Sequence, residues 1–194
     1  MQPSYIAIQK IIEEYFADKD KGPCLKLLAE HRDTMSRAPG SSVNHQAWEG
    51  GYLDHVREGL NLLIVLYPVL ANLRPLPFSL ASALVVFFVH DLEKPWKYAL
   101  ARQAPPPNKF STKALRHAFR LKQMAEYGIV LTDQESNAMQ YIEGEGDAYS
   151  GHHRVMNELA ALCHVADTLS ARLWHDYPKS VGLDEWVGAF RTGG

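Results

Sequence analysis

The sequence predicts an all-α fold built as a single-domain helical bundle. The 194 residues are 46% hydrophobic and 22% charged, a composition that suits one globular domain with a sizeable core. Apolar residues recur at spacings of three and four along several segments, whereas no set of segments shows the period of two that is typical of strands. Loops rich in Pro and Gly separate these helical segments.

The first half of the chain contains three expected helices before its most apolar segment. Ser4–Ala17 is amphipathic, and Pro23–His31 is a short second helix. A long loop, residues 36–51 ("SRAPGSSVNHQAWEGG"), follows, and long loops are often functional. Between Tyr52 and about Tyr67, apolar residues recur at helical spacing, and His55 lies at one edge of that stripe.

The segment Leu80–Asp91 is apolar on all sides and predicts a central helix. Pro95 disfavours helical geometry at Lys94, so we expect the helix to end there, with His90 and Asp91 in its last turn. An unpaired buried carboxylate costs several kcal/mol or more, so a charged group at the end of such a helix requires a compensating partner.

Three more helices are expected in the second half of the chain. One begins near Ser111 and carries His117. The next opens with "TDQE", the spacing of a capping box, and should run to Gly144 with Glu143 in its final turn. The last, about His153–His175, carries Asp167 beside its apolar face.

Charge and cysteine content narrow the classes of partner. The formal charge of −2 gives no global field for nucleic acid or an anionic membrane, so we expect neither long nucleic acid nor membrane as a partner. The apolar runs look too short to span a bilayer, and the N-terminus lacks a signal-peptide pattern, which predicts a cytoplasmic protein. Cys24 and Cys163 form no CxxC pair or disulfide framework, and we expect both to be reduced and structural.

Three of the expected helices each present a group that can bind a metal: His55, the pair His90 and Asp91, and Asp167. A divalent cation would neutralise two carboxylates in apolar surroundings. Imidazole together with carboxylate suits Mn, Fe, Co, Ni or Zn, with Mg as a further candidate. Nucleophilic chemistry has weaker support, because no Gly-x-Ser-x-Gly elbow and no Gly-rich phosphate loop is present.

This ordered set resembles the HD-domain metal-dependent phosphohydrolases. "WEGGYLDH" is similar to the Gly-Gly-x-Leu-x-His segment of one branch, "HDLEKPWKY" to its His-Asp-x-x-Lys segment, and "CHVADTLSAR" to its Ala-Asp-x-Leu-Ser segment. The resemblance covers about residues 44–173. It implies an HD domain over residues 44–177, preceded by N-terminal helices in residues 1–43 that pack on the core and followed by a tail, residues 178–194.

The resemblance also implies roles for individual residues. The metal ligands would be His55, His90, Asp91 and Asp167. His117 matches the first of two further histidines that hold a second metal in many relatives, whereas Glu143 stands where relatives commonly have the other. We therefore expect one tightly held metal, with His117 near the substrate and Glu143 as a candidate ligand of a weaker second site.

Further positions have a less specific assignment. Lys94 is expected to meet a substrate phosphate as a point charge. His45, Trp48 and Trp96 are expected to border the site. For His152 and His153, contact with an anionic substrate and simple exposure are both consistent with the sequence.

Together these features predict a metal-dependent phosphohydrolase that cleaves a phosphate ester or anhydride of a nucleotide or another small phosphorylated metabolite. Two alternatives stay open at this point. One is an HD-type di-iron oxygenase acting on a small substrate, and the other is a non-catalytic nucleotide-binding HD module. The sequence leaves the substrate, the native metal and the oligomeric state undetermined.

Overall fold

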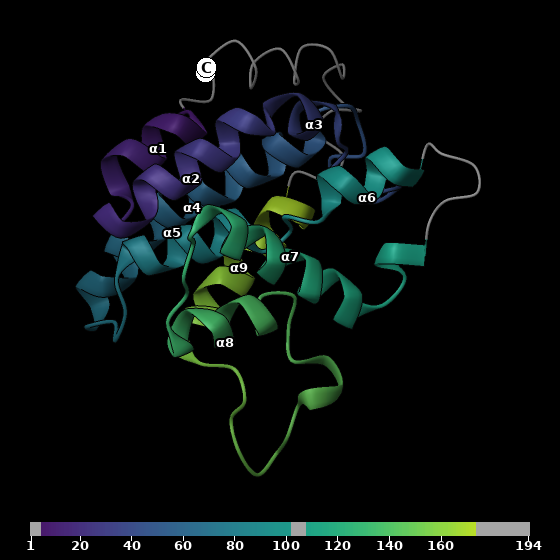
Figure 1. Ribbon diagram of the computed structural model, residues 1–194. Helices are drawn as coiled ribbons and strands as arrows, with labels where there is room; N and C mark the ends of the chain where they lie inside the picture. Colours follow the sequence, from purple (N-terminus) through teal and green to yellow (C-terminus); the bar gives the residue numbers. More distant parts are fainter. Residues whose placement is uncertain (1–4, 102–107, 174–194) are drawn as a thin grey trace.

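The computed structural model describes residues 5–101 and 108–173 (Figure 1), and helices are its only regular elements in those ranges. The α-helices are α1 (Ile8–Tyr15), α2 (Asp18–Glu30), α3 (Arg32–Arg37), α4 (Gly51–Leu73), α5 (Leu80–Val89), α6 (Lys94–Ala101), α7 (Lys113–Tyr127), α8 (Asp133–Tyr141) and α9 (Glu158–Arg172). Two 3₁₀ turns, η1 (Asn108–Phe110) and η2 (Gly146–Ala148), complete the list. The predicted all-α class is confirmed.

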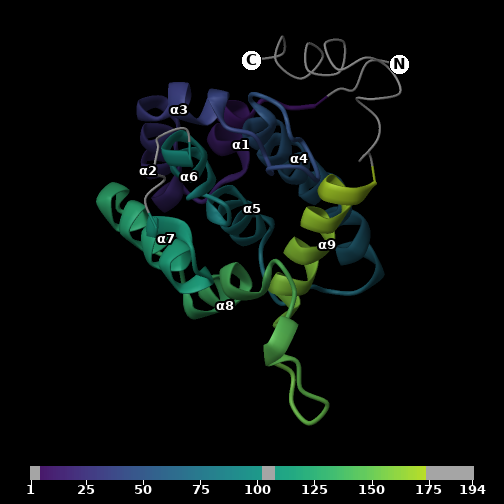
Figure 2. The same cartoon turned by 90° about the vertical axis from the view of Figure 1, so that its right-hand side faces the viewer.

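Helix α5 lies at the centre of the bundle, as its uniformly apolar sequence predicts. Figure 2 shows α4 and α9 on one side of it and α7 and α8 on another. Every residue from Ala83 to Val89 is buried. One hydrophobic cluster joins α5 to side chains of α1, α2 and α3, such as Ile11, Leu27 and Met35, so the N-terminal helices share the core of the bundle.

Close contact between α4 and α5 depends on a glycine. A Cβ atom at Gly59 would stand only 1.9 Å from Cζ of Phe87, so a larger residue there would push the two helices apart. Phe87 in turn lies against His55, with 5.7 Å between the ring centroids. The glycine thus allows the C-terminal end of α5 to lie next to His55.

Several predicted boundaries were wrong. Helix α5 ends at Val89 rather than near Lys94, and a separate helix, α6, begins at Lys94. The physical reason is that Pro95 lies in the first turn of α6, where a missing N–H leaves no hydrogen bond unmade. Asp91 therefore lies in a tight turn between two helices, in which the Lys94 N–H donates to the Asp91 carbonyl over 2.9 Å.

Other helices also differ from the predicted ranges. Helix α2 begins at Asp18, five residues before Pro23, and the short helix α3 lies in the stretch after His31. Helix α9 begins at Glu158 rather than His153, because the Asn157 side chain caps it by accepting the Ala160 N–H over 2.7 Å. The capping box was correct: the Thr132 and Glu135 side chains each accept the other's backbone N–H.

Helix α4 is longer than predicted and continues past Tyr67 to Leu73. It has 23 residues, and an 18-residue stretch of it has a mean hydropathy of 1.3, so by length and composition it could cross a bilayer. The sequence had predicted that the apolar runs were too short for this. In the bundle, 39% of this 18-residue stretch is buried. Its first half buries polar side chains, among them His55, Glu58 and Asn61, and this half carries the site described below.

The two cysteines are free and buried, as predicted. Burial raises the pKa of both thiols. The residues of the expected C-terminal tail, 178–194, lie outside the described part of the chain.

Candidate metal centre

The structure brings together three of the four predicted metal ligands at the end of the central helix. His55 comes from α4, and His90 and Asp91 come from the turn between α5 and α6. One ligand atom from each lies within 4.8 Å of the others, and all three residues are buried. A buried His-His-Asp group that could hold a metal ion is therefore present.

The fourth predicted ligand, Asp167 of α9, reaches the same place. Its Oδ1 lies 3.1 Å from Nε2 of His55 and 3.6 Å from Nε2 of His90. On the other side, Oδ2 of Asp91 lies 3.8 Å from Nε2 of His55 and 3.1 Å from Nε2 of His90. Two imidazole nitrogens thus face two carboxylate oxygens, and the four side chains come from three separate segments of the chain.

The remaining ring nitrogens fix the tautomer of both histidines. Nδ1 of His90 lies 2.6 Å from the Phe87 carbonyl, which can only accept, so Nδ1 carries the proton. Nδ1 of His55 lies 2.9 Å from the Ser170 hydroxyl, and that hydroxyl donates to Oε2 of Glu58 over 2.7 Å. Because the serine proton is already used, Nδ1 of His55 must be the donor, and both Nε2 lone pairs are directed to the carboxylates.

These Nε2 atoms are the feature that a metal would explain. Both are buried and neither has a hydrogen-bond partner. A buried polar atom without a partner is costly, and two such lone pairs opposite two carboxylates repel them unless a proton or a cation lies between. The donor set of two imidazoles and two carboxylates fits a divalent transition metal.

The electrostatics differ between the two histidines. Burial lowers the pKa of His55, although Asp167 opposes the shift. Burial opposes the charged form of His90, but Asp91 and Asp167 outweigh it and raise its pKa to about 10. Burial alone would raise the pKa of Asp167, yet its contacts with His55 and His90 hold that pKa well below the usual range. Burial also opposes the charged form of Asp91, but Lys94 and His90 hold its pKa well below the usual range. Both carboxylates are thus ionised at neutral pH and can bind a cation.

Lys94 contacts the same carboxylate that faces the histidines. Its Nζ pairs with Oδ2 of Asp91, one turn before it along the chain, and the lysine side chain is only 15% exposed. Burial opposes the charged form of Lys94, but Asp91 raises its pKa. The lysine thus lies at the edge of the candidate centre as a positive charge.

His45 borders the group as the sequence predicts. Its ring centroid lies 5.3 Å from that of His55, and its Nε2 is buried without a hydrogen-bond partner. The two predicted tryptophans make other contacts: Trp48 Nε1 donates to Asp54 over 2.7 Å, and the Trp96 ring packs on His31 at 4.7 Å between centroids.

The candidates for a second metal site do not join this group. Glu143 was predicted in the last turn of its helix, but α8 ends at Tyr141 because the chain turns at Ile142 and Gly144 takes a left-handed conformation, φ 99°. Its side chain is 47% exposed and faces Lys113 at 3.8 Å. His117 lies half-buried on α7; burial and then the neighbouring Arg120 lower its pKa.

The pair His152 and His153 lies away from the start of α9. Both are exposed in the segment between α8 and α9, and this segment projects from the bundle in both views (Figures 1 and 2). Of their predicted roles, simple exposure agrees with this placement.

Sequence reasoning missed the polar side chains that support His55. Glu58 is 2% exposed, and its carboxylate accepts from Ser170, from Nε2 of Gln46 at 2.9 Å and from the Tyr5 hydroxyl at 3.4 Å. Burial raises the pKa of Glu58 to about 7, although these hydrogen bonds oppose the shift. The spacing of three between His55 and Glu58 on one helix was the available signal.

Gln46 takes an unusual backbone conformation to make these contacts. Its φ of 41° lies in the left-handed region, which non-glycine residues rarely adopt. A Cβ at Gly51 would lie 1.8 Å from the Gln46 carbonyl oxygen, so only glycine fits there. The loop before α4 is thereby pressed against the first turn of the helix, and the Gln46 amide also donates to the Ser170 carbonyl over 3.1 Å.

We expect Ser170→Ala to weaken metal binding by roughly 10- to 100-fold without unfolding the protein. The reason is that the change removes the acceptor that orients His55, and loss of such a supporting partner typically has that effect. Calorimetric titration with Mn²⁺ or Co²⁺ measures it. Thr168→Ala, an exposed position on the same helix, is the matched control, and equal affinities of the two variants would contradict the assignment of Ser170.

A pH dependence of stability is expected from Glu58. Its pKa is about 7 in the folded chain against 4.5 for an ordinary Glu, so the folded state holds a proton that the unfolded state has lost between these values. The contribution of Glu58 to the free energy of unfolding is therefore fully present below about pH 4.5. It is lost as pH rises towards 7, by up to about 3 kcal/mol. Urea unfolding at pH 5 and pH 7.5 should show the wild type losing more stability than Glu58→Gln. An equal change in both proteins would contradict the expectation.

Comparison of the chain with protein-family models, with curated proteins and with solved structures finds no match.

Proposed function

We propose that this protein is a metal-dependent phosphohydrolase that acts on a nucleotide or another small phosphorylated metabolite. The observation that carries the proposal is the pair of buried Nε2 atoms of His55 and His90, which lack partners and face two carboxylates. The resemblance of three sequence segments to HD-domain phosphohydrolases supports the choice of reaction, because it places the same four ligands in the same order along the chain.

In this proposal His55, His90, Asp91 and Asp167 hold the metal, which when bound polarises a phosphoryl oxygen and lowers the pKa of a water molecule. The residues of the chain orient the ligands and exclude water. Ser170 and the Phe87 carbonyl keep the two imidazoles in the tautomer that ligates. The apolar walls supplied by α5 exclude bulk water, which strengthens every charge interaction in the site.

Lys94 has a role on the substrate side of this site. It pairs with Asp91, and the same carboxylate oxygen faces both histidines. If the carboxylate of Asp91 held a cation, the Lys94 ammonium group would be available to the negative charge of a phosphoryl group. We propose that Lys94 contacts the substrate phosphate in this way. His117 stays a candidate for contact with the substrate, and burial together with the Arg120 charge lowers its pKa.

The test is a screen of chelator-treated protein reloaded separately with Mn²⁺, Fe²⁺, Co²⁺, Ni²⁺, Zn²⁺ and Mg²⁺. Each form is assayed for phosphate, pyrophosphate or tripolyphosphate release from nucleoside mono-, di- and triphosphates and from simple phosphate monoesters. Release by at least one metal form is expected. Absence of release in every combination would overturn the hydrolase proposal. Oxygen consumption by the iron form would favour the oxygenase, and nucleotide binding without turnover would favour the binding module.

A further inference from the structure

The His45 ring lies against the candidate metal centre, and the proposed reaction gives it no role. Its centroid is 5.3 Å from that of His55. The residue as a whole is half-buried, whereas its Nε2 atom is buried and has no hydrogen-bond partner in the described part of the chain. The ring thus extends from the surface to the metal group, with Nε2 at its buried end.

His55, the neighbouring ring, cannot supply a partner for this nitrogen. Nδ1 of His55 donates to the Ser170 hydroxyl, and Nε2 of His55 faces Asp91 and Asp167. Both of its ring nitrogens are therefore already engaged. A buried nitrogen without a partner destabilises a fold, so we expect the partner of His45 to come from outside the chain.

The backbone of the loop before α4 holds His45 in this place. The Ser41 hydroxyl accepts the His45 N–H over 2.9 Å and donates to the His45 carbonyl over 2.8 Å. The Gly40 N–H donates to the carbonyl of Gln46 over 2.9 Å, and Gln46 takes the left-handed conformation described above. A backbone conformation that costs energy persists only where surrounding contacts enforce it, and such residues cluster at functional sites. The loop therefore fixes the position from which the ring reaches the metal group.

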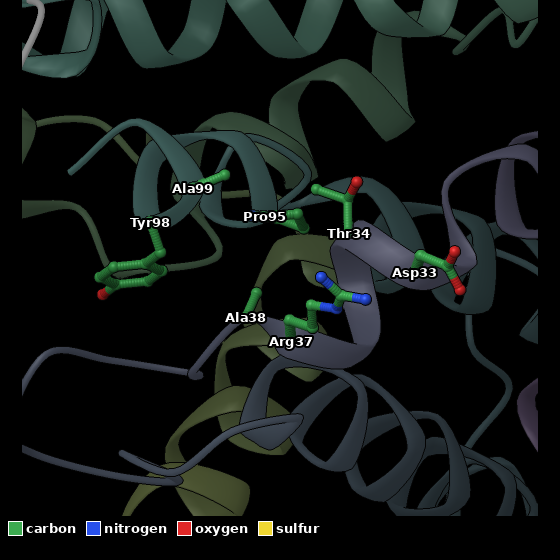
Figure 3. A pocket seen from close by; sticks show the side chains of 7 residues that line it. All are labelled: Asp33, Thr34, Arg37, Ala38, Pro95, Tyr98 and Ala99. Carbon is green, nitrogen blue, oxygen red and sulfur yellow. The ribbon is translucent and has the colours of Figure 1, made fainter. Parts of the chain in front are cut away.

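The same loop starts beside a cleft that lies between α3 and α6 (Figure 3). Ala38 lines this cleft, and its carbonyl accepts the Tyr52 N–H over 3.0 Å, which joins the start of the loop to α4. The cleft has a volume of about 280 Å³, and none of its described lining residues is a candidate metal ligand. The loop thus starts at a cleft without a candidate ligand and reaches the metal group at His45.

We propose that His45 contacts the substrate, with its Nε2 donating a hydrogen bond to an oxygen of the phosphoryl group at the metal centre. The inference rests on the proposed function, because it takes a phosphoryl group to bind there. An imidazole can carry a proton on Nε2 in its neutral and in its charged form, so it is a competent donor to a phosphate oxygen. Lys94 is a donor at the same centre, so the phosphoryl group would be held both from the loop before α4 and from α6.

The test compares His45→Ala and His45→Gln with His31→Ala. His31 is the matched control, because it is also half-buried and also packs on an aromatic ring, that of Trp96, but its Nε2 already has a partner in the Tyr127 hydroxyl at 2.7 Å. Mn²⁺ is titrated calorimetrically into each chelator-treated full-length protein, and inorganic phosphate into each Mn²⁺-loaded one.

We expect His45→Ala to weaken phosphate binding roughly 10-fold, a loss typical of a hydrogen bond to a charged group, and Mn²⁺ binding less than about 2-fold. His45→Gln should recover part of the loss, because the Gln amide can donate from near the position of Nε2. His31→Ala should resemble the wild type. If His45→Ala does not fold, as judged by circular dichroism, His45→Asn replaces it, because its shorter amide cannot reach that position.

Four outcomes would overturn the inference. They are no phosphate binding by the Mn²⁺-loaded wild type, unchanged phosphate binding in His45→Ala, which would leave Nε2 with a bound water only, an equal loss of Mn²⁺ and phosphate binding, which would make His45 a metal ligand, and an equal loss in His31→Ala. Hydrolysis by the same proteins separates this inference from the proposed function. Turnover of phosphate esters with unchanged phosphate binding in His45→Ala removes only the role of His45. Phosphate binding that depends on His45, without hydrolysis by any metal form, supports the role of His45 and removes the hydrolase.

Discussion

Asp91→Asn should abolish tight metal binding and lower metal-dependent hydrolysis by roughly a thousand-fold. The Asp91 oxygen faces both histidines and Lys94, so its charge is the one that a bound cation and the lysine share. Loss of several kcal/mol of transition-state stabilisation, at about 1.4 kcal/mol for each factor of ten, gives a change of this size. The helical core does not involve this carboxylate, and the variant should keep the wild-type circular dichroism spectrum.

The matched control is Asp20→Asn. Asp20 is 3% exposed, as Asp91 is, and it pairs with a neighbouring lysine, Lys19, at 3.4 Å, but it lies on α2 outside the metal group. It should leave the metal content, measured by elemental analysis, at the wild-type value. If Asp91→Asn retained the wild-type metal content, or if both variants lost metal equally, Asp91 would not be a ligand.

The candidate ligand residues could be identified from the sequence because polar groups stand out beside apolar segments. His90 and Asp91 end an otherwise apolar segment, and His55 lies beside an apolar stripe at helical spacing. Burial of such groups is costly unless they have partners, which indicates a site even without structural data. Their meeting point could be predicted because side chains at the end of a central helix are reached from the helices packed on either side.

The boundaries of α6 and α8 could not be predicted in the same way. Pro95 is compatible both with the end of one helix and with the first turn of another, and only the tight turn at Asp91 selects the second. Gly144 indicates a helix end, but the chain leaves α8 before Glu143, so this carboxylate faces solvent and Lys113. The expectation of one tightly held metal and a weaker second site stays a prediction.

The supporting residues were missed because their partners are distant in sequence. Glu58 is separated from Ser170 by 112 residues and Gln46 from Ser170 by 124. Neither spacing carries a local signal, and an isolated Glu or Gln on a helix or in a loop is usually exposed. Tertiary structure alone shows that these groups are buried together behind His55.

Glu93 and Arg120 are a second pair that the sequence did not reveal. Both are buried, at 3% and 5% exposure, and Nε of Arg120 lies 3.6 Å from Oε2 of Glu93. Nη1 of Arg120 donates to the His90 carbonyl. Burial, and then the charge of Asp91, raise the pKa of Glu93, whereas Arg120 lowers it. Arg120 therefore ties α7 to the turn that presents His90 and Asp91.

We expect Arg120→Met to reduce the free energy of unfolding by about 3–5 kcal/mol, because it removes one partner of a buried pair. The Glu93 carboxylate then keeps a more distant arginine, Arg116, at 4.0 Å. The corresponding fall in Tm is about 10 °C for a domain of this size. Adding Glu93→Gln should recover part of the loss, since the double variant no longer buries the Glu93 charge. Arg154→Ala is the control: its ion pair with Glu158 lies at the surface, where water and salt screen the two charges, so its loss should have little effect on stability. Urea unfolding of the four proteins measures these differences. A loss in Arg120→Met as small as that in Arg154→Ala would show that the buried pair does not hold α7 to the His90–Asp91 turn.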